Sequence, residues 1–161
     1  MKLEGFQYAT SLDLNMGYYH ITLMPNVSHL STIVLPWGKY EYLRLPMGIK
    51  NAPDIFQEAM SKLMQDLEFI HVYLDDILCI TSGNWDTHLE QLEKVLTHLE
   101  AAGSNINANK SSFSQMELEY LSFWINHESI QPLSWKVEAI QNIKPPQNRK
   151  QLHQFIKIVN F

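Results

Sequence analysis

Three carboxylates stand out because each lies next to a strongly apolar segment. Asp75 and Asp76 are adjacent between the apolar runs 70–73 and 77–80, and Asp13 lies at the end of another strand-like pattern. Adjacent like charges repel each other and raise each other's pKa unless a cation neutralises them. Mg2+ typically takes one or two carboxylates together with substrate phosphates. Three carboxylates from separate strands therefore predict a two-metal site for phosphoryl transfer, with the ions roughly 3.5–4 Å apart; a solvated turn is the competing interpretation of the Asp pair.

Histidine and cysteine give no comparable signal. The single cysteine, Cys79, lies in an apolar run and is predicted to be a small buried hydrophobe. It cannot form an internal disulfide, which fits a reducing compartment. No histidine has a zinc-binding spacing with another histidine or with Cys79, so no structural metal is assigned. The seven histidines are at positions 20, 29, 71, 88, 98, 127 and 153.

The segments that carry the carboxylates read as strands. Residues 11–15 show apolar alternation that ends near Gly17, which predicts a strand running into a turn. Residues 69–81 predict a hairpin with Asp75 and Asp76 at or near its turn. A second hairpin is expected from strands at 31–35 and 40–45, and a further strand at 118–125.

Two helices are expected to support these strands. From Pro53, apolar residues recur at three- and four-residue steps, which predicts a helix over about 53–68. A second helix is expected over about 86–102, with Asp86 as its N-cap and Gly103 as its C-terminal stop. Its apolar stripe is predicted to be Leu89, Leu92, Leu96 and Leu99. Shorter helices are expected at 136–143 and from about 150.

Composition and charge narrow the function classes. The 161 residues are 45% hydrophobic, 11% aromatic and 18% charged, which is typical of one folded domain and excludes a low-complexity chain. No apolar run is long enough to span a membrane, and residues 1–10 have no secretory signal pattern. The net charge of -5 argues against a free-standing electrostatic nucleic-acid binder, but not against a nucleic-acid enzyme with an acidic metal site. Hairpins and helices without regular alternation predict an α+β fold.

The motif Tyr73-Leu74-Asp75-Asp76 resembles the Tyr-X-Asp-Asp box of reverse transcriptases, and its surroundings resemble those of gypsy-type LTR retrotransposons. The similar segments follow in the family's order and cover nearly the whole chain. They read LEGFQYATSLDLNMGYYHI at 3–21, GKYEYLRLPMGIKNAPDIFQEAM at 38–60, VYLDDILCIT at 72–81, HLEQLEKVLTHLEAAG at 88–103, NKSSF at 109–113 and KVEAIQNIKPPQNRKQLHQFI at 136–156.

This resemblance implies an RNA-directed DNA polymerase of the α+β right-hand type. Its palm would be residues 1–133, with a fingers insertion at about 21–51 and the start of a truncated thumb at 134–161. Its partners would be an RNA template, a DNA primer and dNTP, with no membrane. RNase H and integrase would be expected in the same polyprotein, and a cytoplasmic retroelement particle as its location.

The resemblance also implies roles for the catalytic residues. Asp13, Asp75 and Asp76 would bind two Mg2+ ions, or Mn2+ in their place, with the Leu14 carbonyl assisting. Lys110 would be the general acid for the pyrophosphate leaving group; a solvated surface lysine is the alternative.

The nucleotide and the primer would be contacted by further residues. Tyr18 would be the steric gate under the incoming sugar, and a core tyrosine is the alternative. The other nucleotide contacts implied are Met47, Gly48 and Tyr73. The primer grip implied is Leu121, Ser122, Phe123 and Trp124.

The sequence departs from the family at several positions. Ser122 replaces the usual Gly of Leu-Gly-His, and Ser111 replaces the usual Cys. The first fingers segment of the family precedes the motif that begins at Leu3, so we expect the basic residues of that segment to be missing here. Trp37, Tyr40 and Tyr42 are expected to pack the hairpin of the fingers rather than stack on template bases.

Two other function classes stay open from the sequence. One is a catalytically incompetent retroelement remnant or interaction module that lacks the N-terminal fingers. The other is a different palm-fold enzyme such as a nucleotide cyclase, which would leave the hairpin and C-terminal motifs unexplained.

Overall fold

The centre of the molecule is a four-stranded antiparallel sheet in the order β4-β5-β1-β6. A computed structural model describes residues 5–159. The central strands β1 and β5 pair in a register that places Tyr8 opposite Thr81 and Asp13 opposite Asp76. The four strands are β1 (Tyr8–Asp13), β4 (Ile70–Tyr73), β5 (Asp76–Thr81) and β6 (Ser112–Gln115).

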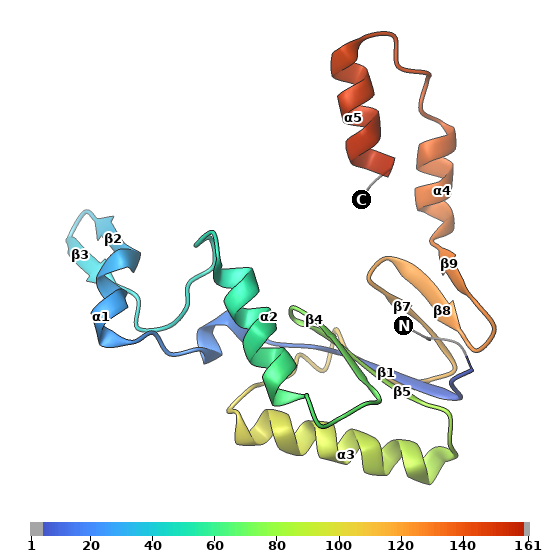
Figure 1. Ribbon diagram of the computed structural model, residues 1–161, viewed down its shortest axis with the longest axis horizontal. Helices are drawn as coiled ribbons and strands as arrows, with labels where there is room; N and C mark the ends of the chain where they lie inside the picture. The colour runs from blue at the N-terminus through green and yellow to red at the C-terminus, as the bar shows by residue number, and fades with distance from the viewer. Residues whose placement is uncertain (1–4, 160–161) are drawn as a thin grey trace.

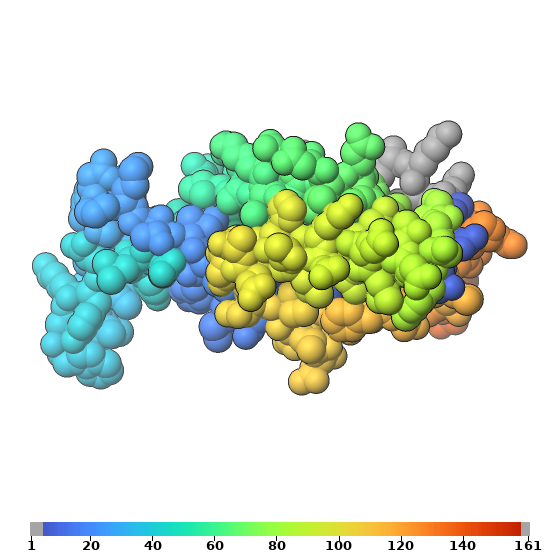
Figure 2. All heavy atoms as spheres, turned by 90° about the horizontal axis from the view of Figure 1, so that it is seen from below, coloured from blue at the N-terminus to red at the C-terminus, as the bar shows by residue number. Residues whose placement is uncertain are grey.

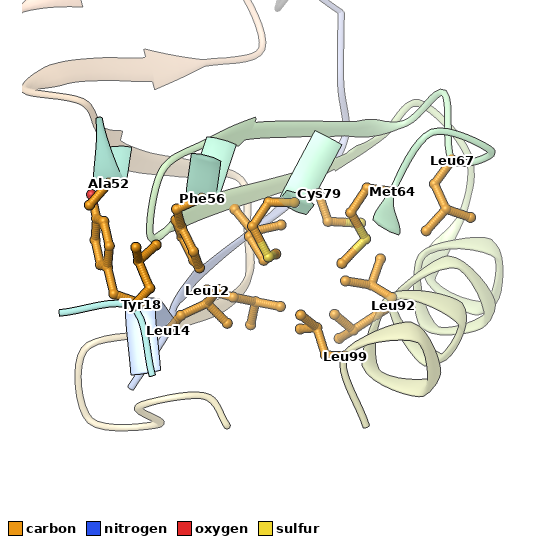
Figure 3. Packing of buried hydrophobic residues seen from close by; sticks show 14 residues of the cluster. Leu12, Leu14, Tyr18, Ala52, Phe56, Met64, Leu67, Cys79, Leu92 and Leu99 are labelled. Atoms are coloured by element: carbon orange, nitrogen blue, oxygen red, sulfur yellow. The ribbon is translucent and has the colours of Figure 1, made fainter. Parts of the chain in front are cut away.

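Helices α2 (Ala52–Leu63) and α3 (Trp85–Ala101) cover one face of this sheet (Figure 1). Because side chains of a strand alternate between faces, Leu12, Ile77 and Cys79 point into this helical layer, where Cys79 is fully buried as predicted. Figure 3 shows Leu12 and Cys79 of the strands beside Phe56, Met64 and Leu92 of the helices. The buried helix residues are Phe56, Met60, Met64, Leu92, Val95 and Leu99.

The opposite face of the sheet is partly covered by a three-stranded sheet, in the order β7-β8-β9. Its strands are β7 (Glu117–Tyr120), β8 (Phe123–Asn126) and β9 (Ile130–Pro132). Leu78, from the alternate face of β5, is buried here together with Leu118 and Ile125. The two cores therefore hold the central sheet from both sides.

A segment at residues 21–45, the projecting segment, extends away from the sheet (Figures 1 and 2). Two antiparallel passes of chain join it to the rest: Leu23 N–H donates to the Leu43 carbonyl at 3.0 Å, and Leu45 N–H donates to the Ile21 carbonyl at 2.9 Å. The turn η1 (Gly17–His20) precedes it. Its elements are α1 (Pro25–Ser28), η2 (His29–Ser31), β2 (Thr32–Leu35) and β3 (Gly38–Glu41).

Helices α4 (Ser134–Gln141) and α5 (Arg149–Val159), the helical pair, follow β9 and stand beyond the sheets (Figure 1). No described residue of α4 is buried. An apolar groove of about 650 Å3 lies between the pair and the second sheet, with Phe123, Trp135 and Ile140 in its lining. None of the helices within residues 5–159 has the length and apolar character that a membrane crossing needs.

The predicted α+β class is confirmed, and several boundaries are corrected. The strand expected at 118–125 is two strands, because the chain reverses at Leu121 and Ser122, where both φ angles are positive. Helix α2 ends at Leu63 rather than near 68, since Met64 leaves the helical conformation. In the projecting segment, β3 ends at Glu41 rather than at 45.

The N-cap of α3 is Asn84, not Asp86: the Asn84 side chain accepts the Thr87 N–H at 2.9 Å. The apolar stripe of α3 is corrected as well, because Leu89 is exposed whereas His88 and Val95 are fully buried. Trp37 is 72% exposed and does not pack the hairpin as expected, whereas Tyr42 is partly buried and the Tyr40 ring lies beside Gly38 of the hairpin. Residues 3–4 of the N-terminal motif and residues 160–161 lie outside the described residues.

Candidate functional site

The central hairpin brings the predicted carboxylates together at one end of the sheet. Asp13 is the last residue of β1 and pairs directly with Asp76, the first residue of β5. Asp75 lies in the two-residue turn between β4 and β5, where Leu74 has a φ of 51°. The Asp75 carbonyl accepts the Leu14 N–H at 3.0 Å, which fastens this turn to the end of β1. The three residues far apart in sequence are thus neighbours through strand register alone.

The carboxylates repel each other. Burial, followed by the charges of Asp13 and Asp76, raises the pKa of Asp75 above its ordinary value. Burial and the charge of Asp13 likewise raise the pKa of Asp76. The Lys110 ammonium opposes both shifts. The cluster therefore carries negative charge that a cation would stabilise.

Asp75 Oδ1 is buried and has no hydrogen-bond partner among the described residues. It lies against Gly17: a Cβ at this glycine would collide with Asp75 Oδ1 and come within 2.7 Å of the Phe56 ring. Sequence reasoning treated Gly17 only as a turn residue. Its lack of a side chain makes the room in which this carboxylate sits.

A loop before β6 supports Asp13. Ser111 Oγ accepts the Asp13 N–H at 3.1 Å and donates to the Asn107 carbonyl at 2.8 Å. Lys110 Nζ lies 3.9 Å from Asp13 Oδ1, and the lysine side chain is 67% exposed. An ion pair this exposed contributes little to stability. Ser111, where the family usually has Cys, thus anchors the Asp13 backbone.

The donor chemistry of the cluster fits a divalent cation, although the ligands do not yet converge. Oxygen donors, crowded negative charge and the unpartnered Asp75 Oδ1 suit a hard ion. No group of three or more His, Cys, Asp or Glu side chains among the described residues is arranged to hold a metal ion as it stands. Mg2+ usually binds one or two carboxylates and completes its shell with waters and substrate phosphates, so a preformed cage of three is not required.

Tyr18 is buried beside this cluster. Its ring stacks on Phe56 at a centroid distance of 4.8 Å, and Figure 3 shows it reaching toward Ala52. Burial, with the charge of Asp75, raises the pKa of the Tyr18 phenol. The residue is thus packed in the core and adjacent to the carboxylates at the same time.

The other residues that the sequence singled out for nucleotide contact are exposed. Met47 is 57% exposed and Tyr73 55% exposed. Gly48 has a φ of 99°, and a Cβ added there would meet no atom within 4 Å. Leu14, whose carbonyl the resemblance implies as a metal ligand, is buried in the helical core.

The four residues expected at the primer grip form the turn of the β7–β8 hairpin and the start of β8. Leu121 and Ser122 are the turn itself, and Phe123 and Trp124 begin the following strand. Tyr120, directly before the turn, is buried, and its hydroxyl donates to the Asp76 carbonyl at 3.5 Å. Tyr120 links this hairpin to the carboxylates, and no sequence signal pointed to it.

Gln57 on α2 holds the turn that carries Asp75. Its Oε1 accepts the Leu74 N–H at 2.7 Å, and its Nε2 donates to the Val72 carbonyl at 3.1 Å. Both ends of one amide therefore bind the hairpin backbone on either side of Tyr73. Sequence reasoning missed Gln57 because its partners are backbone groups of a distant element.

Known proteins resemble this chain in sequence. Residues 1–125 match the family model for "Reverse transcriptase (RNA-dependent DNA polymerase)". The chain is 34% identical over 161 residues to the retrovirus-related Pol polyprotein from transposon opus of Drosophila melanogaster, covering 99% of this chain and 16% of the relative. It is 32% identical over 162 residues to the transposon Tf2-3 polyprotein of Schizosaccharomyces pombe, covering 99% and 12%.

Solved structures agree with these relatives. The foamy viral protease-reverse transcriptase dRH in complex with double-stranded DNA superposes with a TM-score of 0.87 at 28% identity, covering 97% of this chain and 27% of that one. The foamy viral protease-reverse transcriptase in complex with an RNA/DNA hybrid gives 0.82 at 28% identity, covering 96% and 21%.

The predicted lineage and the α+β polymerase palm are confirmed, and the gypsy-type assignment is consistent with opus and Tf2. The chain spans less than a third of the length of each of these relatives and structures. Its sequence, its sheet topology and the place of its carboxylates make it a member of the reverse transcriptase (RNA-dependent DNA polymerase) family.

Proposed function

We propose that this chain is the palm, with part of the fingers and the first thumb helices, of an RNA-directed DNA polymerase. The observation that carries the proposal is the pairing of Asp13 with Asp76 at the end of the central strands, with Asp75 in the adjoining turn. The substrates are an RNA template, a DNA primer and dNTP. Residues 1–133 are the palm, about 21–51 the fingers insertion and 134–161 the start of the thumb.

Asp13, Asp75 and Asp76 are proposed to hold two Mg2+ ions, or Mn2+ in their place, with help from the Leu14 carbonyl. When bound, the ions supply charge neutralisation at the attacking and leaving oxygens. The primer 3′-hydroxyl loses its proton to solvent and its oxygen attacks the α-phosphorus of the dNTP in line; the bond from that phosphorus to the bridging oxygen breaks, and pyrophosphate leaves. Lys110 donates a proton to the pyrophosphate; its position 3.9 Å from Asp13 supports this role.

The remaining proposed roles concern positioning. Tyr18 limits the space under the sugar of the nucleotide, and its firm stacking on Phe56 supports a rigid gate. Met47, Gly48 and Tyr73 contact the nucleotide; the exposure of Met47 and Tyr73 leaves both free to do so. The primer grip is formed by Leu121, Ser122, Phe123 and Trp124.

We place the chain within a longer retroelement polyprotein that includes RNase H and integrase, acting in cytoplasmic particles. The polyprotein names of its relatives support this assignment. The alternative of a catalytically inactive remnant is less well supported, because all three carboxylates and their backbone anchors are intact.

The direct test is primer extension on an RNA template with Mg2+ and dNTP, comparing the chain with its Asp75→Asn variant. In any preparation that extends the primer, we expect activity to fall by about a hundredfold or more in the variant; this chain by itself is expected not to extend the primer. Asp66→Asn, which changes an exposed carboxylate outside the cluster, is the matched control and is expected to retain activity. Equal activity in Asp75→Asn would refute the metal-ligand assignment. Inactivity of both proteins would mark this chain as an incomplete enzyme and leave its family unchanged, and restoring the upstream fingers segment would then be the next test.

Metal binding gives an independent readout. Titration with Mn2+, followed by electron paramagnetic resonance, is expected to show weaker binding in Asp75→Asn than in Asp66→Asn. Unchanged Mn2+ binding in both variants would contradict a metal site at the cluster.

A further inference from the structure

His88 on α3 is fully buried, although it lies outside the carboxylate cluster and has no part in the proposed chemistry. Its Nε2 lies 2.9 Å from Thr10 Oγ1 on β1, and its Nδ1 lies 2.9 Å from Thr81 Oγ1 on β5. One imidazole therefore joins the helix to both central strands. Those strands end in Asp13 and begin in Asp76, respectively.

Counting donors around His88 fixes where its proton is. With Gln91 Oε1 facing Thr81, the single Thr81 hydroxyl proton is donated to that oxygen, and Thr81 Oγ1 then accepts a hydrogen bond from His88 Nδ1–H. In a neutral imidazole the other nitrogen is then an acceptor, and Thr10 donates its hydroxyl proton to His88 Nε2. Thr10 Oγ1 in turn accepts the Ser114 N–H of β6 at 2.9 Å.

The result is a chain of hydrogen bonds that runs in one direction, from Ser114 through Thr10, His88 and Thr81 to Gln91. Each hydroxyl proton is donated once. These hydrogen bonds connect β6, β1, α3 and β5. Strands β1 and β5 carry Asp13 and Asp76, β6 pairs with β1, and helix α3 packs behind them. We infer that His88, as the neutral Nδ1–H tautomer, is a positioning residue that locks α3 and β6 onto the strands bearing the catalytic carboxylates.

Protonation of His88 would break this lock. A proton on Nε2 would point at the Thr10 hydroxyl, whose own proton would then lose its acceptor. Burial lowers the pKa of His88. The titratable groups nearest to it on the packed strands are Tyr8, whose ring centroid lies 5.8 Å away, and Cys79, which hydrogen-bonds Thr81. Burial raises the pKa of the Cys79 thiol to about 12, so this group carries no charge at neutral pH.

The sign of the pH effect follows. The unfolded chain takes up a proton at His88 near pH 6.5 and the folded chain resists it, so this contribution to stability is complete above pH 6.5. It is lost as the pH falls from 6.5 through the lowered pKa of the folded state.

The decisive experiment is two-bond proton–nitrogen NMR of the whole chain, with the ring signals assigned through single His variants. We expect His88 to show the neutral Nδ1–H pattern and to take up a proton only below pH 6.5, because burial lowers its pKa. The Nε2–H tautomer, or protonation of the ring at or above pH 6.5, would overturn the inference. This readout needs no polymerase activity, so it stands or falls separately from the proposed function.

Variants test the positioning role. His88→Leu is expected to speed amide hydrogen exchange at Ser114 by about fivefold or more, because Thr10 loses its partner. The matched control is His98→Leu on the same helix, whose imidazole bonds only the Lys94 carbonyl of its own helix; Ser114 exchange should not change. Equal exchange in both variants would contradict the lock, and if His88→Leu fails to fold, the tautomer of the unmodified chain still decides.

The catalytic consequence rests on the proposed function. In an active preparation, His88→Leu is expected to lower kcat with little change in the KM for dNTP, because the carboxylates lose their fixed positions while the nucleotide contacts remain. A raised KM with unchanged kcat would assign His88 to substrate binding and contradict a positioning role.

Discussion

At the scale of residues, the carboxylate cluster that suits a cation also destabilises the folded protein. Asp75 keeps a buried oxygen without a hydrogen-bond partner, and its pKa is raised by burial and by two neighbouring carboxylates. Such a group destabilises the fold in the absence of a cation. The glycine beside it and the serine behind Asp13 are the local conditions under which this arrangement is tolerated.

The first prediction concerns stability. Asp75→Asn is expected to raise the Tm of the metal-free protein at neutral pH, because the amide removes charge repulsion. The sign follows from the raised pKa of Asp75: the folded state holds its proton more tightly, so stability falls as the pH rises from about 3.8 through the folded-state pKa. The gain in Tm should therefore shrink toward pH 4. Differential scanning calorimetry in EDTA measures the Tm of each variant at pH 4 and at pH 7, with Asp66→Asn as the control. A lower Tm for Asp75→Asn than for the unmodified protein at pH 7 contradicts the electrostatic account.

At the scale of elements, the carboxylates are positioned by two hairpins and the helix that supports one of them. The β4–β5 turn is held by Gln57 from α2, and the β7–β8 turn is linked to Asp76 through Tyr120. Both turns contain non-glycine residues with positive φ, which costs about 1 kcal/mol or more per residue. Supporting contacts offset this strain.

Removing the two hydrogen bonds from Gln57 to the β4–β5 hairpin should lower the stability of the protein measurably. Gln57→Leu leaves the Leu74 N–H and the Val72 carbonyl without their side-chain partner, at a cost of about 1–3 kcal/mol. We expect a lower urea midpoint and faster hydrogen exchange at the Leu74 amide. Gln65→Leu, at an exposed position just beyond the same helix, should change neither quantity. If the Leu74 amide still exchanges slowly in Gln57→Leu, the turn is stable without the Gln57 side chain.

Substitutions can relieve the backbone strain of the β7–β8 turn. Leu121 and Ser122 both have positive φ in a two-residue hairpin connection, where Asn-Gly is strongly preferred. Ser122→Gly, alone or with Leu121→Asn, should stabilise the protein by about 0.5–1 kcal/mol, measured by urea unfolding. Ser82→Gly is the control, since Ser82 has no positive φ and should give no gain. Destabilisation by Ser122→Gly would mean that the serine side chain contributes more than the strain it carries.

Features that depend on residues close together in the sequence could be predicted, whereas features that depend on distant residues could not. The Asp75–Asp76 hairpin and the two supporting helices are local patterns, and they are confirmed. The β7–β8 turn was missed because both of its residues have positive φ, a conformation for which Asn and Gly are typical and Leu121 and Ser122 are not. Gln57, Tyr120 and His88 were missed because their partners are more than 5 residues away and depend on how strands pair.

At the scale of the whole molecule, the core is confined to the central sheet and its two coverings. The projecting segment exposes Leu30, Val34 and Trp37, each more than 70% exposed, and the described part of the helical pair is largely exposed as well. Among the described residues, the two extensions contribute to the buried clusters only through Ile21 and Leu23 at the base of the projecting segment and Leu45 at its end. The sheet and helices α2 and α3 should therefore fold without the C-terminal helices.

This separation gives a prediction for a shortened chain. Residues 1–133, ending at Leu133, are expected to melt within a few degrees of the full chain, because α4 buries no described residue. Calorimetry of both chains measures this, and Asp75→Asn in each background should give the same shift in Tm. A large loss of Tm on removing 134–161 would show that the helical pair is part of the palm's own core.

The register that sets Asp13 opposite Asp76 also limits which genetic changes the segment can survive. Along β1, Leu12 enters the helical core while Asp13 lies on the alternate face, so losing or gaining one codon between Tyr8 and Leu12 would exchange the two. A leucine would then stand in the site and an aspartate in the core. A single in-frame codon insertion or deletion in β1 would therefore disrupt both the carboxylate pairing and the core, whereas a substitution would alter only one position.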